Sequence, residues 1–139
     1  MKLTLIALAA FTLAAAPALA AGDAEKGAKE FNKCKSCHAI VAADGTAIVK
    51  GGKTGPNLFG VVGRKAGSEE GFKYGEGLVE LGTTGLVWDE ALIAAYVADP
   101  STFVKEKTGD AAAKSNMTFK LAKGGEDVAA YLASVKPAQ

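Results

Sequence analysis

Apolar positions near both ends of the chain recur at the spacing of an α-helix. Asp23 can cap a first helix, whose apolar residues run directly into a pair of cysteines. At the other end, Gly124-Gly125 breaks the chain before acidic residues that suit the start of a helix. We expect these two terminal helices to pack together, with Gly27 allowing a close backbone crossing. The apolar positions are Ala24, Gly27, Ala28 and Phe31 in the first helix and Val128, Tyr131, Leu132 and Val135 in the last.

A third helix is predicted in the second half of the chain. Trp88-Asp89-Glu90 marks its start, and Pro100 ends it soon after Asp99. No segment is predicted to be a strand. Residues 42–67 hold seven glycines and are predicted to be mostly ordered loop. A loop of this length is uncommon in a compact domain unless it serves a function, such as wrapping a ligand.

The first twenty residues have the pattern of a secretory signal peptide. Lys2 precedes an apolar run over residues 3–16, and Ala18-Leu19-Ala20 is a small-residue cleavage sequence. We expect cleavage near Ala20/Ala21, export to the periplasm, and a single domain over residues 21–139 with one modest core. The apolar run is short for a membrane anchor and lacks a stop-transfer flank, and the alternative is a segment that is not cleaved and anchors the protein in the membrane.

Cys34-Lys35-Ser36-Cys37-His38 is the segment with the clearest chemistry. Cys-x-x-Cys followed at once by His is the spacing of a c-type haem attachment site. Two thiols three positions apart can lie on one face of a helical turn, where each can add to a vinyl group of the haem. The adjacent imidazole is then held against the iron. The motif therefore predicts thioether bonds from Cys34 and Cys37 and iron ligation by His38.

Three other interpretations of the two cysteines compete with a haem. A redox disulfide of the thioredoxin kind belongs near a βαβ pattern, which does not surround this motif. A structural zinc ion needs four ligands, whereas the chain holds two Cys and one His. A structural disulfide would use both thiols without needing His38, and closing so short a loop would constrain the unfolded chain little.

Iron held by one imidazole has a second open face, and its occupant decides between electron transfer and chemistry on a small molecule. The chain contains two methionines, and Met1 leaves with the predicted signal peptide. Met117 remains, in a polar segment without the apolar stripe of a core methionine that fills a gap. We expect Met117 to be the second axial ligand, which raises the reduction potential and closes the iron to oxygen and peroxide.

Charge is balanced overall but uneven along the sequence. Without Lys2, 15 basic and 15 acidic side chains remain. Residues 33–65 and 100–125 are mainly basic and contain the candidate haem ligands, whereas residues 66–99 are mainly acidic. We expect the basic segments to border the haem and the acidic segment to lie away from it, which would steer an acidic partner. Ordinary solvated lysines are the simpler alternative, and neither charge nor motif supports nucleic-acid binding.

Together these motifs resemble the class I soluble cytochromes c, most closely the bacterial cytochromes c2 and c550. The resemblance covers essentially the whole mature chain. It implies an all-α cytochrome c fold, with about three main helices and long glycine-rich loops wrapped round one covalently bound haem c. The segments that carry it are Gly22–Gly27, Cys34–His38, Lys53–Leu58, Gly60–Arg64, Phe72–Tyr74, Trp88, Tyr96–Pro100, Met117–Phe119 and Glu126–Leu132.

The resemblance also implies a role for each of ten residues. Cys34 and Cys37 resemble the thioether attachment points, and His38 and Met117 the iron ligands. The carbonyl of Pro56 resembles the group that accepts a hydrogen bond from the ligand histidine. The remaining roles are those of Arg64, Tyr74 and Trp88 around a buried haem propionate, Tyr96 beside the methionine sulfur, and Phe119 flanking the haem edge.

The function that the resemblance implies is periplasmic one-electron transfer rather than catalysis. Electrons would pass from ubiquinol-cytochrome c reductase to a photosynthetic reaction centre or a cytochrome oxidase. The protein would be a monomer that docks to these partners through lysines around the haem edge. The alternative is a c-type haem peroxidase or gas-binding protein with an open iron site. Two residues depart from the family pattern, since Asn116 stands where members often have Lys and Leu78 where mitochondrial members have Asn.

Overall fold

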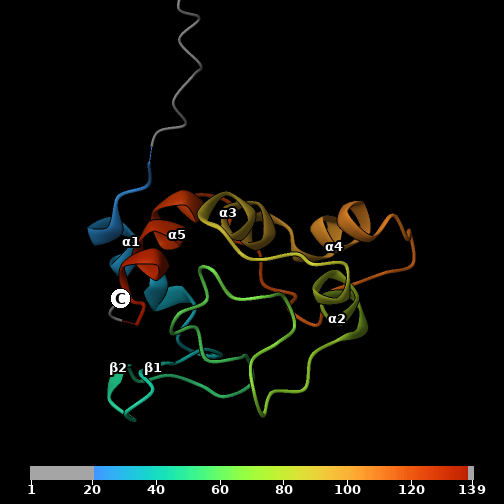
Figure 1. The fold of residues 1–139 in the computed structure, drawn as a ribbon. Coiled ribbons are helices and arrows are strands. Elements are labelled where there is room, and N and C mark those ends of the chain that lie inside the picture. Colours follow the sequence, from blue (N-terminus) through green and yellow to red (C-terminus); the bar gives the residue numbers. More distant parts are fainter. Residues whose placement is uncertain (1–20, 138–139) are drawn as a thin grey trace, which may run out of the picture.

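The computed structural model describes residues 21–137, so the predicted signal peptide lies outside the described residues. Figure 1 shows helices α1 and α5 at one end, α2 and α4 at the other, and α3 between them. Within residues 21–137, no helix has the length and apolar character needed to cross a membrane. The elements are α1 (Ala24–Glu30), the 3-10 turn η1 (Phe31–Lys33), β1 (Ile40–Val41), β2 (Ala47–Val49), α2 (Glu76–Thr83), α3 (Glu90–Ala98), α4 (Pro100–Thr108) and α5 (Gly125–Ser134).

The two terminal helices pack against each other, which confirms the prediction. The Asp23 carboxylate accepts hydrogen bonds from the N–H groups of Glu25 and Lys26, at 3.0 and 3.1 Å, and so caps α1. Gly27 lies where the helices cross, because a Cβ there would overlap the carbonyl oxygen of Asp127. The N–H of Asp23 also donates to the Asp127 carboxylate at 2.8 Å. This crossing joins the beginning and the end of the described chain.

Helix α3 begins as predicted, and two further helices, α2 and α4, accompany the three main helices that were expected. Asp89 caps α3 by accepting from the N–H of Leu92 at 2.7 Å. Pro100 lies beyond the end of α3 and occupies the first position of α4, where a missing N–H costs nothing. Asp99 caps this helix by accepting from the N–H of Thr102 at 3.1 Å. Helix α2 was also not predicted, because glycines within it weaken the helical pattern.

Strands β1 and β2 form an antiparallel hairpin, so the prediction of no strand is wrong. Ile40 pairs with Val49 and Val41 with Ala47, with an irregularity between the two pairs. Gly45 turns the chain with a φ of 86°, in the left-handed region that favours glycine. Strands of two and three residues are too short to show an alternating apolar pattern.

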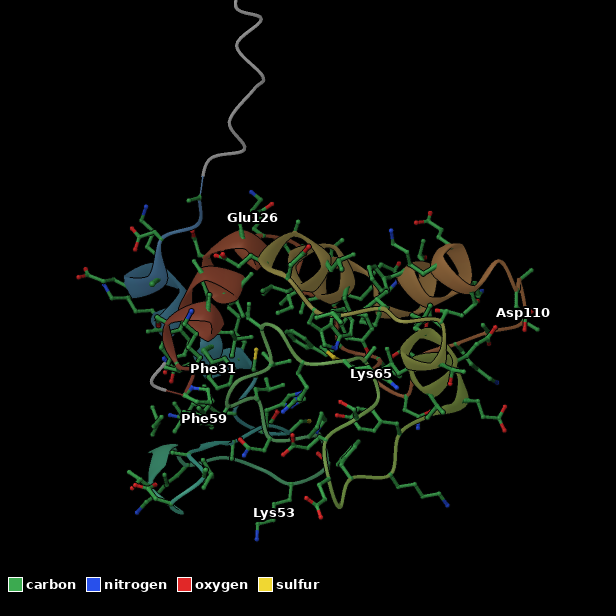
Figure 2. The ribbon with its side chains drawn as sticks, viewed as in Figure 1. Phe31, Lys53, Phe59, Lys65, Asp110 and Glu126 are labelled. Carbon is green, nitrogen blue, oxygen red and sulfur yellow. The ribbon has the colours of Figure 1, made fainter. Side chains whose placement is uncertain are left out.

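The apolar core lies between the helices and the glycine-rich segment. Residues 50–75 contain neither helix nor strand and lie across the molecule from α1, α3 and α5 (Figure 1). Charged side chains such as Lys53 and Asp110 point outward at the periphery (Figure 2). The buried apolar side chains are Phe31, Ile40, Val61, Ala66, Leu81, Trp88, Ile93, Tyr96, Phe103, Val104, Leu121, Val128, Ala129 and Leu132.

Candidate functional site

A cavity of about 390 Å³ opens between the helices and the glycine-rich segment. Its walls come from the Cys-x-x-Cys-His turn, the loop over residues 54–64, residues 72–78, helix α3, residues 114–119 and helix α5. All ten site residues predicted from the sequence line this one cavity: Cys34, Cys37, His38, Pro56, Arg64, Tyr74, Trp88, Tyr96, Met117 and Phe119. Segments far apart in the sequence therefore converge on one apolar space.

His38 presents one ring nitrogen to the cavity and uses the other to fix its orientation. Its Nδ1 lies 2.8 Å from the carbonyl oxygen of Pro56. Because a carbonyl only accepts, Nδ1 carries the proton and Nε2 keeps its lone pair. Burial lowers the pKa of His38, and the hydrogen bond to Pro56 acts in the opposite direction. Gly55 packs closely against the ring, since a Cβ there would lie only 2.3 Å from Cε1 and 2.6 Å from Nδ1.

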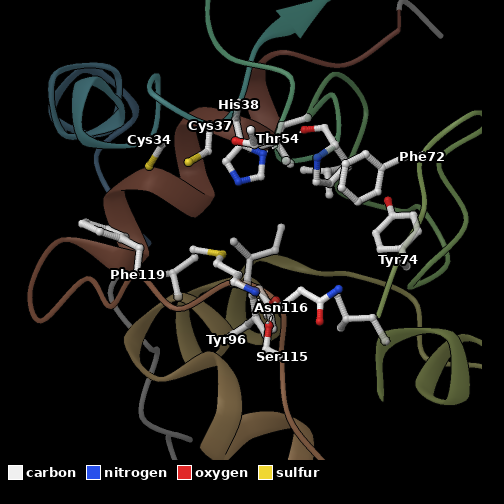
Figure 3. Close-up of a pocket in the computed structure, with 18 of the residues that line it drawn as sticks. Cys34, Cys37, His38, Thr54, Phe72, Tyr74, Tyr96, Ser115, Asn116 and Phe119 are labelled. Atoms are coloured by element: carbon white, nitrogen blue, oxygen red, sulfur yellow. Dashed lines mark hydrogen bonds between the residues drawn. The ribbon is translucent and has the colours of Figure 1, made fainter. Parts of the chain in front are cut away.

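The two cysteines lie on one helical turn beside His38. The N–H groups of Cys37 and His38 both donate to the carbonyl oxygen of Cys34, at 3.1 and 2.9 Å. Figure 3 shows both sulfur atoms on the same side of the cavity as the imidazole. Neither cysteine is in a disulfide. Burial raises the pKa of the Cys34 thiol, whereas hydrogen bonds from the hydroxyls of Thr54 and Ser36 lower that of Cys37.

Ser115 organises the opposite wall, where Met117 lies. Figure 3 shows Ser115 and Asn116 across the cavity from His38. The Ser115 hydroxyl accepts a hydrogen bond from the N–H of Met117 at 3.0 Å and pairs with the Tyr96 hydroxyl at 2.6 Å. Ser115 is 8% exposed, so both bonds are withdrawn from water. Burial also raises the pKa of the Tyr96 phenol, which is therefore neutral at pH 7.

Arg64, Tyr74 and Trp88 line a further part of the same wall. The Arg64 guanidinium donates to the carbonyl oxygens of Asn57, at 2.9 Å, and Phe59, at 3.4 Å, and forms an ion pair with Glu69. The Tyr74 hydroxyl accepts from the N–H of Glu69 at 3.3 Å, which leaves its own proton to donate. Trp88 is 8% exposed, and its indole N–H donates to no group in the part of the chain that the structure describes.

The charged side chains around the cavity all come from the basic segments, but the expectation that the acidic segment lies away from the site is wrong. The charged residues that line the cavity are Lys33, Arg64 and Lys114, which all come from the basic segments. Residues 66–99, however, also border the cavity instead of lying away from it. They do so through uncharged side chains, because the chain has to surround the cavity and turns its apolar and aromatic residues inward: Phe72, Tyr74, Gly75, Leu78, Trp88, Ile93, Tyr96 and Val97.

Both residues that depart from the cytochrome c pattern reach the cavity. Leu78 lines it from helix α2. Asn116 lines it next to Met117 and packs against Gly75, where a Cβ would lie 2.8 Å from the amide oxygen of Asn116. The amide side chain at position 116 therefore contacts the start of α2.

Comparisons with known proteins place the chain in a family. No protein-family model matches it. It is 62% identical to cytochrome c2 of Rhodobacter capsulatus over 97% of this chain and 98% of the relative, and 57% identical to cytochrome c-550 of Paracoccus versutus over 99% and 91%. The solved structure of the Rhodobacter capsulatus protein superimposes with a TM-score of 0.81, at 67% identity over 82% of this chain and 98% of that chain. The chain belongs to the class I bacterial cytochrome c2 family.

Members of the cytochrome c2 family carry covalently bound haem c and transfer electrons, so the chain is an electron carrier and not an enzyme. The same comparison confirms the class I cytochrome c fold. The structure of ferric cytochrome c-550 from Paracoccus versutus agrees, with a TM-score of 0.81 at 61% identity over 84% of this chain and 99% of that chain. The roles of the ten individual residues in this cytochrome stay predictions.

Sequence reasoning missed two features of this cytochrome site. Glu69 belongs to the acidic segment that was expected far from the haem, yet it contacts Arg64. Asn57 fixes the loop before Arg64, because its side chain donates to the carbonyl of Val41 and accepts from the N–H of Val41, at 2.8 and 2.9 Å. No local pattern predicts either contact, since both depend on how the glycine-rich segment folds back.

Proposed function

We propose that this chain is a periplasmic one-electron carrier that holds one haem c between His38 and Met117. Cys34 and Cys37 would attach it by adding each S–H across a vinyl C=C bond, so that sulfur binds one carbon, hydrogen goes to the other and no atom leaves. When bound, the haem supplies an iron that alternates between two oxidation states. The observation that carries the proposal is the convergence of all ten predicted residues on one cavity.

The donor set of the cavity fits a haem. His38 keeps the Nε2 lone pair free because its Nδ1 proton is engaged by Pro56. This bond fixes the ring and makes the free nitrogen more electron-rich. Met117 offers a neutral thioether, which favours the reduced iron and raises the reduction potential. With both residues as ligands, the iron would have no position left for a small molecule, which favours electron transfer over the peroxidase or gas-binding alternative.

The wall around Arg64 fits a carboxylate. Arg64 carries a positive charge, the Tyr74 hydroxyl has a proton to donate, and the indole N–H of Trp88 donates to nothing within the described residues. Donors grouped on an otherwise apolar wall offset the cost of burying a charged acceptor. These three residues would therefore hold a haem propionate, while Tyr96 and Ser115 hold the backbone at Met117.

The surface around the cavity supports the partners that the resemblance implies. Lys33 and Lys114 line it, and Phe119 is 44% exposed at its rim. Basic side chains around an apolar opening favour a partner with an acidic docking surface. We assign ubiquinol-cytochrome c reductase as donor and a photosynthetic reaction centre or cytochrome oxidase as acceptor. The monomer would meet each in turn in the periplasm, after removal of residues 1–20 as a signal peptide leaves a single domain over residues 21–139.

Replacing Met117 by alanine tests the ligand set. The oxidised wild-type protein should show the weak near-infrared charge-transfer band of ferric haem ligated by methionine, and M117A should lack it and have a markedly lower reduction potential. The reduced wild-type protein should not bind carbon monoxide at neutral pH, whereas reduced M117A should. A band that survives in M117A, or ready carbon monoxide binding by the wild type, would contradict ligation by Met117 and favour an open iron site.

A further inference from the structure

Glu69 is the charged partner of Arg64. The guanidinium makes two bonds to backbone carbonyls and an ion pair to the Glu69 carboxylate. The Arg64 and Glu69 side chains are only 16% and 24% exposed, so the pair is largely withdrawn from solvent. Solvent and salt therefore screen this pair less than the exposed ion pairs of the surface.

Backbone hydrogen bonds hold Glu69 against the cavity wall that Arg64 lines. Its N–H donates to the Tyr74 hydroxyl at 3.3 Å, and its carbonyl accepts from the N–H of Phe72 at 3.3 Å. Phe72 lines the main cavity and also a smaller hollow of about 280 Å³, which Glu69 lines as well. Figure 3 shows Phe72 and Tyr74 together at this end of the cavity. Glu69 thus lies directly behind the wall, in contact with groups that face inward.

The charge of Glu69 is opposite to every charge that lines the cavity. Lys33, Arg64 and Lys114 are all cationic, whereas Glu69 stands behind one of them. A carboxylate in contact with the guanidinium cancels part of the positive potential that Arg64 creates in the cavity. Ferric haem carries one more positive charge than ferrous haem, so a fixed negative charge at this place favours the oxidised form.

We propose that Glu69 is a positioning residue that holds Arg64 in the wall and lowers the reduction potential by sharing the guanidinium with the haem propionate. This inference rests on the proposed function, because it needs a haem with a propionate at Arg64. It concerns a side chain that does not itself line the main cavity and acts only through Arg64. Glu69 therefore sets how much of the Arg64 charge reaches the haem.

The matched variants Glu69→Gln and Glu70→Gln test the proposal. Both remove one negative charge at adjacent positions, but Glu70 is exposed and forms no ion pair within the described residues. Each haem-loaded protein is equilibrated with a redox mediator, and the equilibrium constant for electron exchange is measured. E69Q should shift this constant toward reduced protein on the order of threefold, and E70Q by clearly less. Equal shifts in the two variants, or no shift in E69Q, would overturn the proposal.

A second pair of variants tests whether Glu69 acts through Arg64. In an Arg64→Gln background there is no positive charge at position 64 for Glu69 to share or cancel. Adding E69Q to R64Q should then change the equilibrium constant much less than E69Q does alone, and an undiminished effect would overturn the proposal. Failure of the proposed function looks different, since the wild-type protein would then be colourless. Normal haem spectra with equal potentials in E69Q and E70Q would refute the Glu69 inference alone.

Discussion

Ser115→Ala is the substitution that most directly tests how the wall around Met117 is held. The Ser115 hydroxyl pairs with the Tyr96 hydroxyl at 2.6 Å and accepts from the N–H of Met117 at 3.0 Å. Leaving a buried phenol without a partner costs roughly 1–3 kcal/mol, and the lost bond to the backbone costs about 1 kcal/mol more. S115A should therefore lower the free energy of unfolding by about 2–4 kcal/mol.

The functional consequence of S115A is a looser Met117 segment. If about 1.4 kcal/mol of the loss falls on this segment, an external ligand that displaces Met117 should bind about tenfold more tightly. Guanidinium unfolding measures the stability, and titration of ferric protein with imidazole measures the affinity. Tyr96→Phe is the control, because it removes one bond and leaves the acceptor for Met117 intact, so it should cost only about 1 kcal/mol.

The double variant Y96F/S115A completes the S115A test. It has no stranded phenol, so it should be less destabilised than the sum of the two single variants, by about 1 kcal/mol. An S115A protein with unchanged stability and unchanged imidazole affinity would show that the Ser115 hydroxyl does not hold the Met117 segment. Strictly additive single effects would show that Tyr96 and Ser115 do not act together.

Three further predictions concern the helix crossing, acid stability and docking. Gly27→Ala should lower the free energy of unfolding, measured with guanidinium, by about 3 kcal/mol, because its Cβ would overlap the Asp127 carbonyl oxygen. Ala28→Gly is the control, since Ala28 is exposed and this change affects helix propensity alone. A G27A protein of wild-type stability would contradict the close helix crossing. The hydrogen bond from Lys120 lowers the pKa of Asp99 below its ordinary 3.8, so the stability that this bond contributes is complete above pH 3.8 and is lost as the pH falls through the lower folded-state pKa. Asp99→Asn should therefore flatten the dependence of the unfolding free energy on pH in that acid range. An unaltered pH dependence would argue against the bond between Asp99 and Lys120. Replacing Lys35, Lys53 and Lys114 together by glutamine should slow association with the redox partner roughly tenfold at low salt and little at high salt. Equal slowing at all ionic strengths would exclude electrostatic steering.

The parts of the fold that the sequence predicts are those fixed by strong local signals. Asp23 and Asp89 cap the first turns of α1 and α3, and both helices form where expected. Helix α4 was missed because Pro100 both follows one helix and starts another. Whether a proline ends or begins a helix depends on the next turn, which here is stabilised by Asp99. The hairpin was missed because its strands are shorter than any periodic pattern.

The residues that line the cavity could be named from the sequence, although their individual roles stay predictions. Cys34, Cys37 and His38 form a local motif, and Met117 is the one methionine left after the predicted cleavage. The contacts between distant loops were not predictable in the same way. Glu69 reaches Arg64 because the loop between them turns at Gly67, where φ is 65°. The distribution of charges along the sequence does not reveal this turn, so the ion pair could not be predicted.

A redox titration of the absorption spectrum tests directly whether this chain holds one haem c between His38 and Met117. The protein is produced in a host that attaches haem c, and spectra are recorded as the solution potential is stepped in both directions. We expect one haem per chain, a single reversible one-electron transition, and the methionine-ligated band in the oxidised state only. A colourless protein with two titratable thiols would contradict haem attachment and favour disulfide chemistry at Cys34 and Cys37.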